Sequence, residues 1–73
     1  MQTLTNTQRQ ILDMIDYYYT LSEVKEEGVL KYRRELCIKR AAKKFYYAAG
    51  SLEVYLTTYS AMYEEYKAEK AKK

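Results

Sequence analysis

The sequence predicts an all-α fold, because it has few residues that end helices and carries a long helical repeat of apolar side chains. It contains no proline and two glycines, Gly28 and Gly50, so the usual signals of turns between strands are nearly absent. Apolar side chains recur at spacings that alternate three and four, which keeps them on one face of a helix. The repeat comprises Ile38, Ala41, Phe45, Ala48, Leu52, Tyr55, Tyr59, Met62 and Tyr66.

The first helix is expected over residues 7–27. Thr5, Asn6 and Thr7 are types that cap helix N-termini, and they precede the first apolar residues. Gly28 indicates the end, because glycine commonly follows the last helical residue. The polar residues of this helix fall in one narrow arc, and apolar or aromatic residues cover roughly 240° of its surface. Such a helix is expected to pack against more than one neighbour.

The second helix is expected over residues 29–68, with no break at Gly50. The apolar repeat keeps its phase through Gly50 and Ser51, and two separate helices would have no reason to stay in register across a turn. A glycine inside a helix costs only about 1 kcal/mol. The alternative is a three-helix bundle, in which Gly50 ends the second helix and Ser51 caps a third.

These lengths predict a helical hairpin that forms a dimeric helical bundle. The long helix would span about 60 Å and the first helix about 30 Å, so a hairpin leaves half of the apolar stripe uncovered. The hydrophobic core of so short a chain also needs additional stabilisation. Two hairpins joined in a four-helix core would bury the stripe, so we expect a homodimer. All 73 residues are expected to belong to a single helical domain.

Tyrosine is conspicuous, with 10 occurrences in 73 residues. A buried tyrosine must find a partner for its hydroxyl, whereas tyrosine is enriched in protein interfaces because its ring is large and rigid and its tip is polar. The uncovered half of the stripe is therefore the candidate surface for self-association or for partner binding. The alternative is an ordinary dimer seam with the hydroxyls in water. The candidate residues are Leu52, Tyr55, Tyr59, Met62, Tyr63 and Tyr66.

Charge is distributed unevenly along the chain. Residues 1–27 carry a net charge of −3, and residues 51–73 are neutral overall. Residues 28–50 hold seven basic side chains and one acidic side chain, a net charge of +6. One side of the predicted second helix presents Arg33, Arg40, Lys43, Lys44 and Tyr47. Such a strip would follow a phosphate backbone and stack a base, or it would instead pair with the acidic arc of the first helix, an acidic protein or a lipid surface.

No catalytic, cofactor or metal site is expected. Histidine is absent, and no serine or cysteine lies in the sequence context of a nucleophile. Cys37, the single cysteine, cannot form an internal disulfide or a typical zinc site and is expected to be a small buried hydrophobe. The longest weakly charged stretch, residues 45–63, is too polar to span a membrane. The polar first ten residues lack a secretory signal, which favours the cytoplasm.

Two functions are consistent with these features. The first is a non-enzymatic protein–protein interaction module, a small regulator, inhibitor or scaffold that binds a larger protein through the tyrosine-rich half of the second helix. The second is a small basic nucleic-acid-binding regulator that uses Arg33, Arg40, Lys43 and Lys44. The sequence does not indicate which protein the partner would be.

Overall fold

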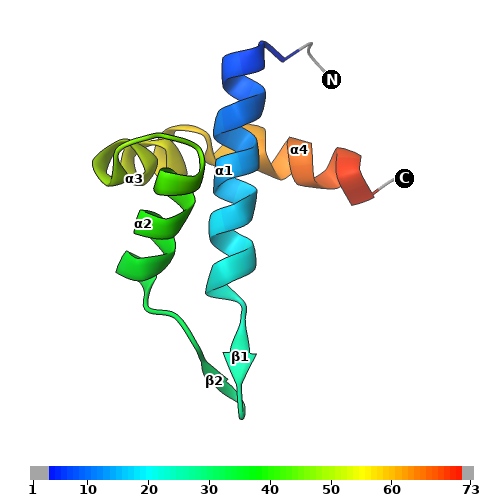
Figure 1. Cartoon of the computed structure of the whole chain (residues 1–73). Coiled ribbons are helices and arrows are strands. Elements are labelled where there is room, and N and C mark those ends of the chain that lie inside the picture. The colour runs from blue at the N-terminus through cyan, green and yellow to red at the C-terminus, as the bar shows by residue number, and fades with distance from the viewer. Residues whose placement is uncertain (1–3, 72–73) are drawn as a thin grey trace.

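A computed structural model describes residues 4–71, which form four helices and one short β-hairpin (Figure 1). The mostly helical composition confirms the all-α class predicted from the sequence. In chain order the elements are α1 (Asn6–Ser22), β1 (Lys25–Glu26), β2 (Val29–Leu30), α2 (Arg34–Lys44), α3 (Ala49–Thr58) and α4 (Ser60–Ala71).

The first helix begins close to its predicted start. The Thr5 hydroxyl accepts a hydrogen bond from the backbone N–H of Gln8 at 3.1 Å, and the backbone N–H of Thr5 donates to the Gln8 side-chain oxygen at 3.0 Å. This reciprocal pair is a capping box, which satisfies two backbone donors that the first helical turn leaves free. Helix α1 therefore begins at Asn6, one residue before the expected position.

The predicted end of the first helix at residue 27 is wrong, because α1 stops at Ser22 and a hairpin follows. Glu26 pairs with Val29 in the antiparallel ribbon. Between them, Glu27 and Gly28 have φ angles of 55° and 82°. A two-residue loop with positive φ at both positions is the preferred connection for a tight hairpin, so Gly28 closes this loop and does not cap a helix.

The predicted continuous helix over residues 29–68 is also wrong. Helix α2 ends at Lys44, the chain turns through Phe45–Ala48, and α3 begins at Ala49. The alternative break at Gly50 and Ser51 lies in the same region but a few residues too late, since both residues belong to α3. Helices α3 and α4 are interrupted only at Tyr59. Its backbone bonds to Tyr55 and Tyr63, both 2.8 Å long, carry the helical hydrogen bonding across the interruption.

Packing explains why the chain turns back after α2. The turn places Tyr46 in the left-handed backbone region, with φ 63°, at a cost of about 1–2 kcal/mol. A straight helix would carry α3 and α4 away from α1. Turning back buries Leu52, Tyr63 and Tyr66, and each large apolar side chain so buried contributes about 1.5–3 kcal/mol.

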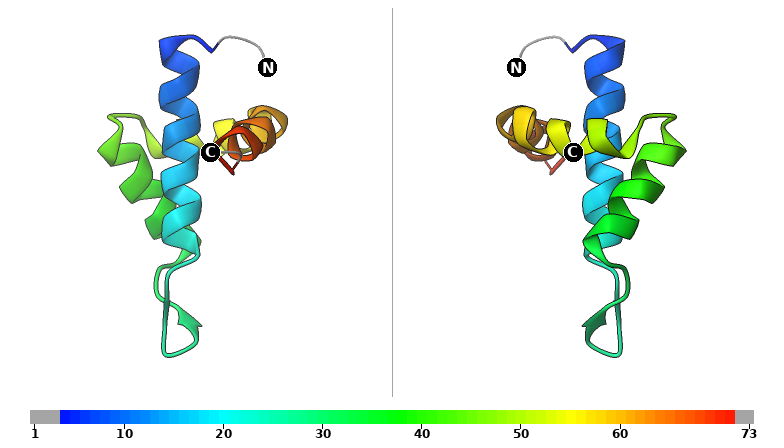
Figure 2. Two further views of the ribbon diagram at one scale, coloured as in Figure 1. Left: turned by 90° about the vertical axis from the view of Figure 1, so that its right-hand side faces the viewer. Right: turned by 90° about the vertical axis from the view of Figure 1, so that its left-hand side faces the viewer.

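Helix α1 lies at the centre of the fold. It contacts α2, α3 and α4, and Figure 2 shows it standing between α2 on one side and α4 on the other. This confirms that the broad apolar arc of the first helix serves more than one neighbour. The buried core comprises Ile11, Leu12, Met14, Ile15, Tyr18, Cys37, Ile38, Ala41, Ala42, Leu52, Tyr63 and Tyr66.

Candidate nucleic-acid interface

Helices α2 and α3 form a helix–turn–helix unit with a turn of four residues, Phe45–Ala48. The backbone N–H of Tyr47 donates to the carbonyl of Ala42 at 2.8 Å, and that of Tyr46 donates to Lys43 at 3.2 Å. This bond pattern is a Schellman motif, which usually has glycine at the left-handed position that Tyr46 occupies here. The motif ends α2 and sets α3 across α1 and α2 instead of along α2 (Figure 1).

Small and branched side chains hold α3 against the rest of the unit. Ala41 and Ala42 are buried on α2, and Leu52 of α3 is fully buried. Methyl side chains at these α2 positions let the two helices approach closely. The ring of Phe45 meets Tyr17 of α1 edge-on, with 6.4 Å between ring centroids. Helix α3 contacts both α2 and α1, and these contacts hold its orientation.

Helix α3 has two opposite faces. Its inner face consists of Leu52, Tyr55, Leu56 and the following Tyr59, all buried or half-buried. The outer face consists of residues with the same helical spacing of three, four and seven positions, and all of them are exposed: Gly50, Glu53, Val54 and Thr57. We call these four residues the α3 outer face. Side chains at this spacing share one side of a helix.

Two basic residues of α2 lie beside the α3 outer face. The Arg34 guanidinium is 3.6 Å from the Glu53 carboxylate. Lys39 lines a shallow groove of about 200 Å³ together with Glu35, Ile38, Ala49 and Glu53. Arg34 and Lys39 therefore lie along the α2 side of the outer face, where the carboxylates of Glu35 and Glu53 also lie. The sequence prediction missed both basic residues, because it placed them on a single long helix with no neighbouring α3.

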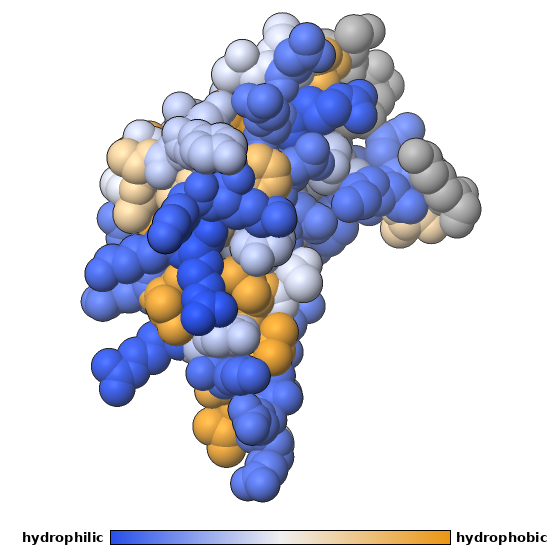
Figure 3. Space-filling view, in the orientation of Figure 1, coloured by the Kyte–Doolittle hydropathy of each residue, from blue (hydrophilic) through white to orange (hydrophobic). Residues whose placement is uncertain are grey.

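The predicted basic strip lies mainly on the other side of α2. The Arg40 guanidinium stacks over the ring of Tyr32 at 5.0 Å, and the Lys44 ammonium stacks over Tyr17 of α1 at 5.2 Å. Arg33 and Lys43 are exposed. Hydrophilic side chains cover most of α2 in the view of Figure 3. Tyr47 is half-buried and packs on Tyr55, with 6.0 Å between ring centroids, so its ring is used inside the fold.

The candidate tyrosine surface is divided between the core and its margin. Leu52, Tyr63 and Tyr66 are buried, whereas Tyr55, Tyr59 and Met62 are half-buried. The two buried hydroxyls donate hydrogen bonds to carboxylates of α1, Tyr63 to Asp16 and Tyr66 to Asp13. These contacts supply the partners that buried tyrosine hydroxyls require. The folded chain itself therefore covers most of the surface that the sequence assigned to a partner.

Titratable groups in the core are held in their neutral forms. Burial, followed by the hydrogen bond to Asp13, raises the pKa of Tyr66 to about 12. Burial and the hydrogen bond to Asp16 likewise raise the pKa of Tyr63. Burial raises the pKa of the Cys37 thiol, which is fully enclosed as the sequence predicted. Within residues 4–71, no group of three or more acidic or cysteine side chains is placed to hold a metal ion.

Comparison with known proteins found no match to a family model, a curated protein or a solved structure. No helix in the described part of the chain combines the length and the apolar composition needed to cross a membrane. In the sequence, positions 50, 53, 54 and 57 are interleaved with the apolar repeat, but Gly50 and Val54 are not residue types that mark an exposed face.

Proposed function

We propose that this chain is a non-enzymatic protein that binds double-stranded DNA through its α2–turn–α3 unit. Two helices joined by a turn of three to four residues form the DNA-binding helix–turn–helix, in which the second helix enters the major groove. The observation that carries the proposal is the turn at Phe45–Ala48, which directs the exposed α3 outer face outward beside Arg34 and Lys39.

Charge supports a polyanionic ligand. The segment that contains the turn and α2 has a net charge of +6, and phosphate contacts provide most of the sequence-independent affinity for DNA. The α3 outer face itself holds one charged residue, Glu53, whose carboxylate is next to Arg34. The arrangement matches a duplex, in which phosphates border the groove and base edges with both hydrogen-bond donors and acceptors line its floor.

The test is a fluorescence anisotropy titration of labelled DNA duplex over a series of salt concentrations. We expect Arg34→Ala with Lys39→Ala to lower affinity by about tenfold or more, and to reduce the slope of log affinity against log salt by about 2. The matched control is Arg40→Ala with Lys44→Ala, which removes the same charge from the α1 side of α2. The control should leave the slope close to that of the parent protein.

Three results would overturn the proposal. The first is that the parent protein binds no duplex even at low salt. The second is that it binds single-stranded RNA more tightly than duplex DNA. The third is that both charge variants weaken binding equally, because equal effects would mean that only total charge matters and the α2–α3 orientation does not. Circular dichroism of both variants verifies that each remains folded.

A homodimer remains part of this proposal. Helix–turn–helix proteins commonly bind as dimers to two half-sites about one helical turn of DNA apart. The hairpin extends away from the helices (Figure 1), and Val29 and Leu30 are 68% and 56% exposed there. Sedimentation of the parent protein and of Val29→Ser with Leu30→Ser tests whether this apolar pair joins two copies. A parent protein that is monomeric both alone and on a two-site duplex would contradict the dimer.

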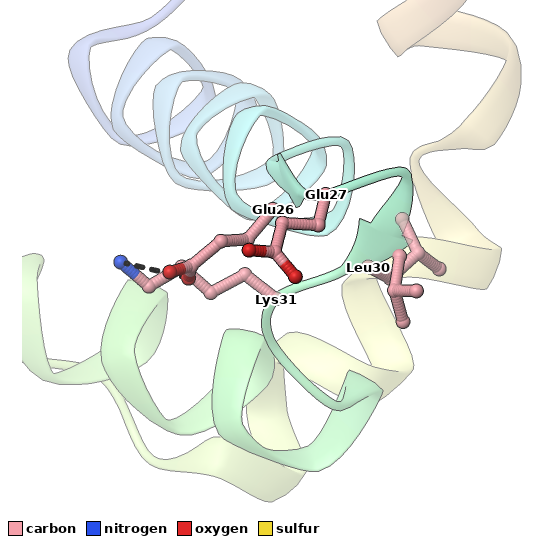
Figure 4. A pocket seen from close by; sticks show the side chains of 5 residues that line it. Glu26, Glu27, Leu30 and Lys31 are labelled. Atoms are coloured by element: carbon pink, nitrogen blue, oxygen red, sulfur yellow. Dashed lines mark ion pairs between the residues drawn. The ribbon is translucent and has the colours of Figure 1, made fainter.

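Binding to a larger protein is the second candidate function, and the same exposed pair favours it. Figure 4 shows the side chains of Glu26 and Lys31 running alongside each other and meeting at their charged ends, with Leu30 pointing away from them; the ion pair is 3.8 Å long. Exposed apolar side chains bordered by charges are typical of a contact with another protein. As with DNA binding, we propose that the protein acts in the cytoplasm as a regulator. If Val29→Ser with Leu30→Ser lost biological activity while DNA binding was retained, the second function would be favoured.

A further inference from the structure

We propose that the α3 outer face reads bases, with Glu53 selecting cytosine and Val54 selecting an adjacent thymine. This inference rests on the proposed DNA-binding function and names the residues that would give it sequence preference. The four residues of the face lie at positions 50, 53, 54 and 57, all on one side of α3 and all exposed. None of them is basic, so their contribution would be specificity, while Arg34 and Lys39 would supply the phosphate contacts.

Gly50 leaves open space at the first turn of α3. A Cβ atom built on Gly50 would have no atom within 4 Å, and its φ angle is not in the left-handed region. Neither packing nor backbone conformation therefore requires glycine, although glycine in a helix costs about 1 kcal/mol relative to alanine. A bare backbone at the first turn of α3 lets the helix sit deeper in a groove, where the first residues of a recognition helix meet the base edges.

Glu53 has the chemistry and the support to read a cytosine. An ionised carboxylate only accepts hydrogen bonds, and the cytosine amino group is a donor in the major groove. Adenine also has a donor amino group, but its N7 acceptor lies beside it and would repel a carboxylate. Arg34 lies 3.6 Å from Glu53, where it would balance the negative charge near the phosphates and hold the carboxylate at the α2 side of the groove.

Val54 offers an apolar surface at the centre of the outer face. Its side chain is 60% exposed and follows Glu53 directly. The major groove contains one apolar group among the four bases, the C5-methyl of thymine. Thr57 lies one helical turn further on, and its hydroxyl can donate or accept. The expected recognition element is therefore a cytosine next to a thymine, with less selective contacts on the Thr57 side.

The experiment is selection of binding sequences from a pool of random DNA duplexes. The parent protein should enrich one cytosine with a neighbouring thymine. Glu53→Gln should change the preferred base at the cytosine position to adenine, because a glutamine amide pairs with adenine N6 and N7. The matched control, Glu65→Gln, makes the same charge change at an exposed position on α4 and should select the same sequences as the parent.

A second measurement isolates Val54. In the selected duplex the thymine base is replaced by uracil, which lacks only the methyl group. The parent protein should lose affinity by about fivefold, and Val54→Ser should bind both duplexes equally. Val54→Ser should keep the parent affinity for random-sequence duplex within about twofold, since Val54 contacts no phosphate in this proposal.

The outcomes separate this inference from the proposed function. If the parent protein binds duplex in a salt-dependent way but selects no sequence, or if Glu53→Gln selects the same sequence as the parent, the base-reading inference is wrong and DNA binding stands. If the parent protein binds no duplex, both are wrong. The inference would be supported if Glu53→Gln changes the preference at the cytosine position alone and if replacing thymine by uracil weakens binding of the parent protein but not of Val54→Ser.

Discussion

The hydroxyl of Tyr63 donates a hydrogen bond to Asp16 at 3.1 Å, which joins α4 to α1 across 47 positions of the chain. The other carboxylate oxygen of Asp16 is 3.3 Å from the ammonium of Lys70, and Tyr66 donates to Asp13. The acidic residues Asp13 and Asp16 of α1 thus bind two tyrosines and one lysine of α4. Arg40 and Lys44, which were alternative partners for the acidic arc of α1, stack on aromatic rings instead.

We expect Tyr63→Phe to lower the free energy of unfolding by about 1–3 kcal/mol. The change removes a hydrogen bond to a charged acceptor while keeping the buried ring, and bonds of this kind contribute about 1.5–3 kcal/mol. Urea unfolding at neutral pH measures the change. Tyr46→Phe is the control, because its ring is 96% exposed, and it should unfold as the parent does. A parent-like midpoint for Tyr63→Phe would mean that the bond contributes nothing to stability.

Stability should fall at alkaline pH. Tyr66 has its pKa raised to about 12 by burial and by its bond to Asp13, and the pKa of Tyr63 is also raised, whereas tyrosines of the unfolded chain ionise near about 10. Unfolding therefore releases protons above pH 10. The contribution is fully present below pH 10 and is lost as pH rises toward 12, by up to about 1.4 kcal/mol per pH unit for each tyrosine.

Urea unfolding across this pH range checks the alkaline prediction. The double variant Tyr63→Phe with Tyr66→Phe starts from a lower stability and should lose less of it between pH 10 and 12. Equal slopes for the parent and the double variant would show that other groups cause the alkaline loss.

Tyr46→Gly should raise the free energy of unfolding by about 1 kcal/mol. A non-glycine residue in the left-handed region costs about 1–2 kcal/mol, and the added flexibility of glycine in the unfolded chain offsets part of that gain. The exposed ring contributes little packing. Thermal unfolding of Tyr46→Gly against Tyr46→Ala separates the backbone effect from loss of the ring. Destabilisation by Tyr46→Gly would show that the ring, despite its exposure, stabilises the turn.

Ala42→Leu should lower the free energy of unfolding by about 1–3 kcal/mol, because it places a larger side chain into a packed contact. Ala42 is 2% exposed, and its carbonyl also accepts the Tyr47 bond that closes the turn. The same variant should weaken duplex binding, since a displaced α3 cannot present its outer face beside Arg34. Lys43→Leu adds a similar side chain at an exposed position and is the control for stability. Normal stability for Ala42→Leu would mean that the α2–α3 contact has spare volume.

Local signals in the sequence predicted the start of α1 and the mostly helical composition. The capping residues near Thr5 and the shortage of helix-ending residues are local features of the sequence, so they could be recognised without a structure. The apolar repeat was also real in part, because Leu52, Tyr55, Tyr59, Met62 and Tyr66 all face the core or its margin. The error was to extend one register from Ile38 through to these residues.

The breaks after α2 and after α3 could not be predicted, because neither contains the glycine that normally marks the end of a helix. The left-handed position after α2 holds Tyr46 where glycine is usual, and the glycine four residues later, Gly50, lies inside a helix. Tertiary packing on α1 decides the turn, and a single helical wheel contains no information about it. The predicted basic strip left out Arg34 and Lys39 for the same reason, because their position beside α3 is visible only in the folded structure.

The central position of α1 has a consequence for how this chain can be divided. Every other helix uses α1 as its packing partner, and contributions to the core come from both ends of the sequence, from Ile11 to Tyr66. A fragment that contains the helix–turn–helix alone would expose the undersides of both its helices to water. We therefore expect that removal of α1 or α4 abolishes folding of the whole chain. Amide hydrogen exchange throughout the helices should then proceed through one global opening event.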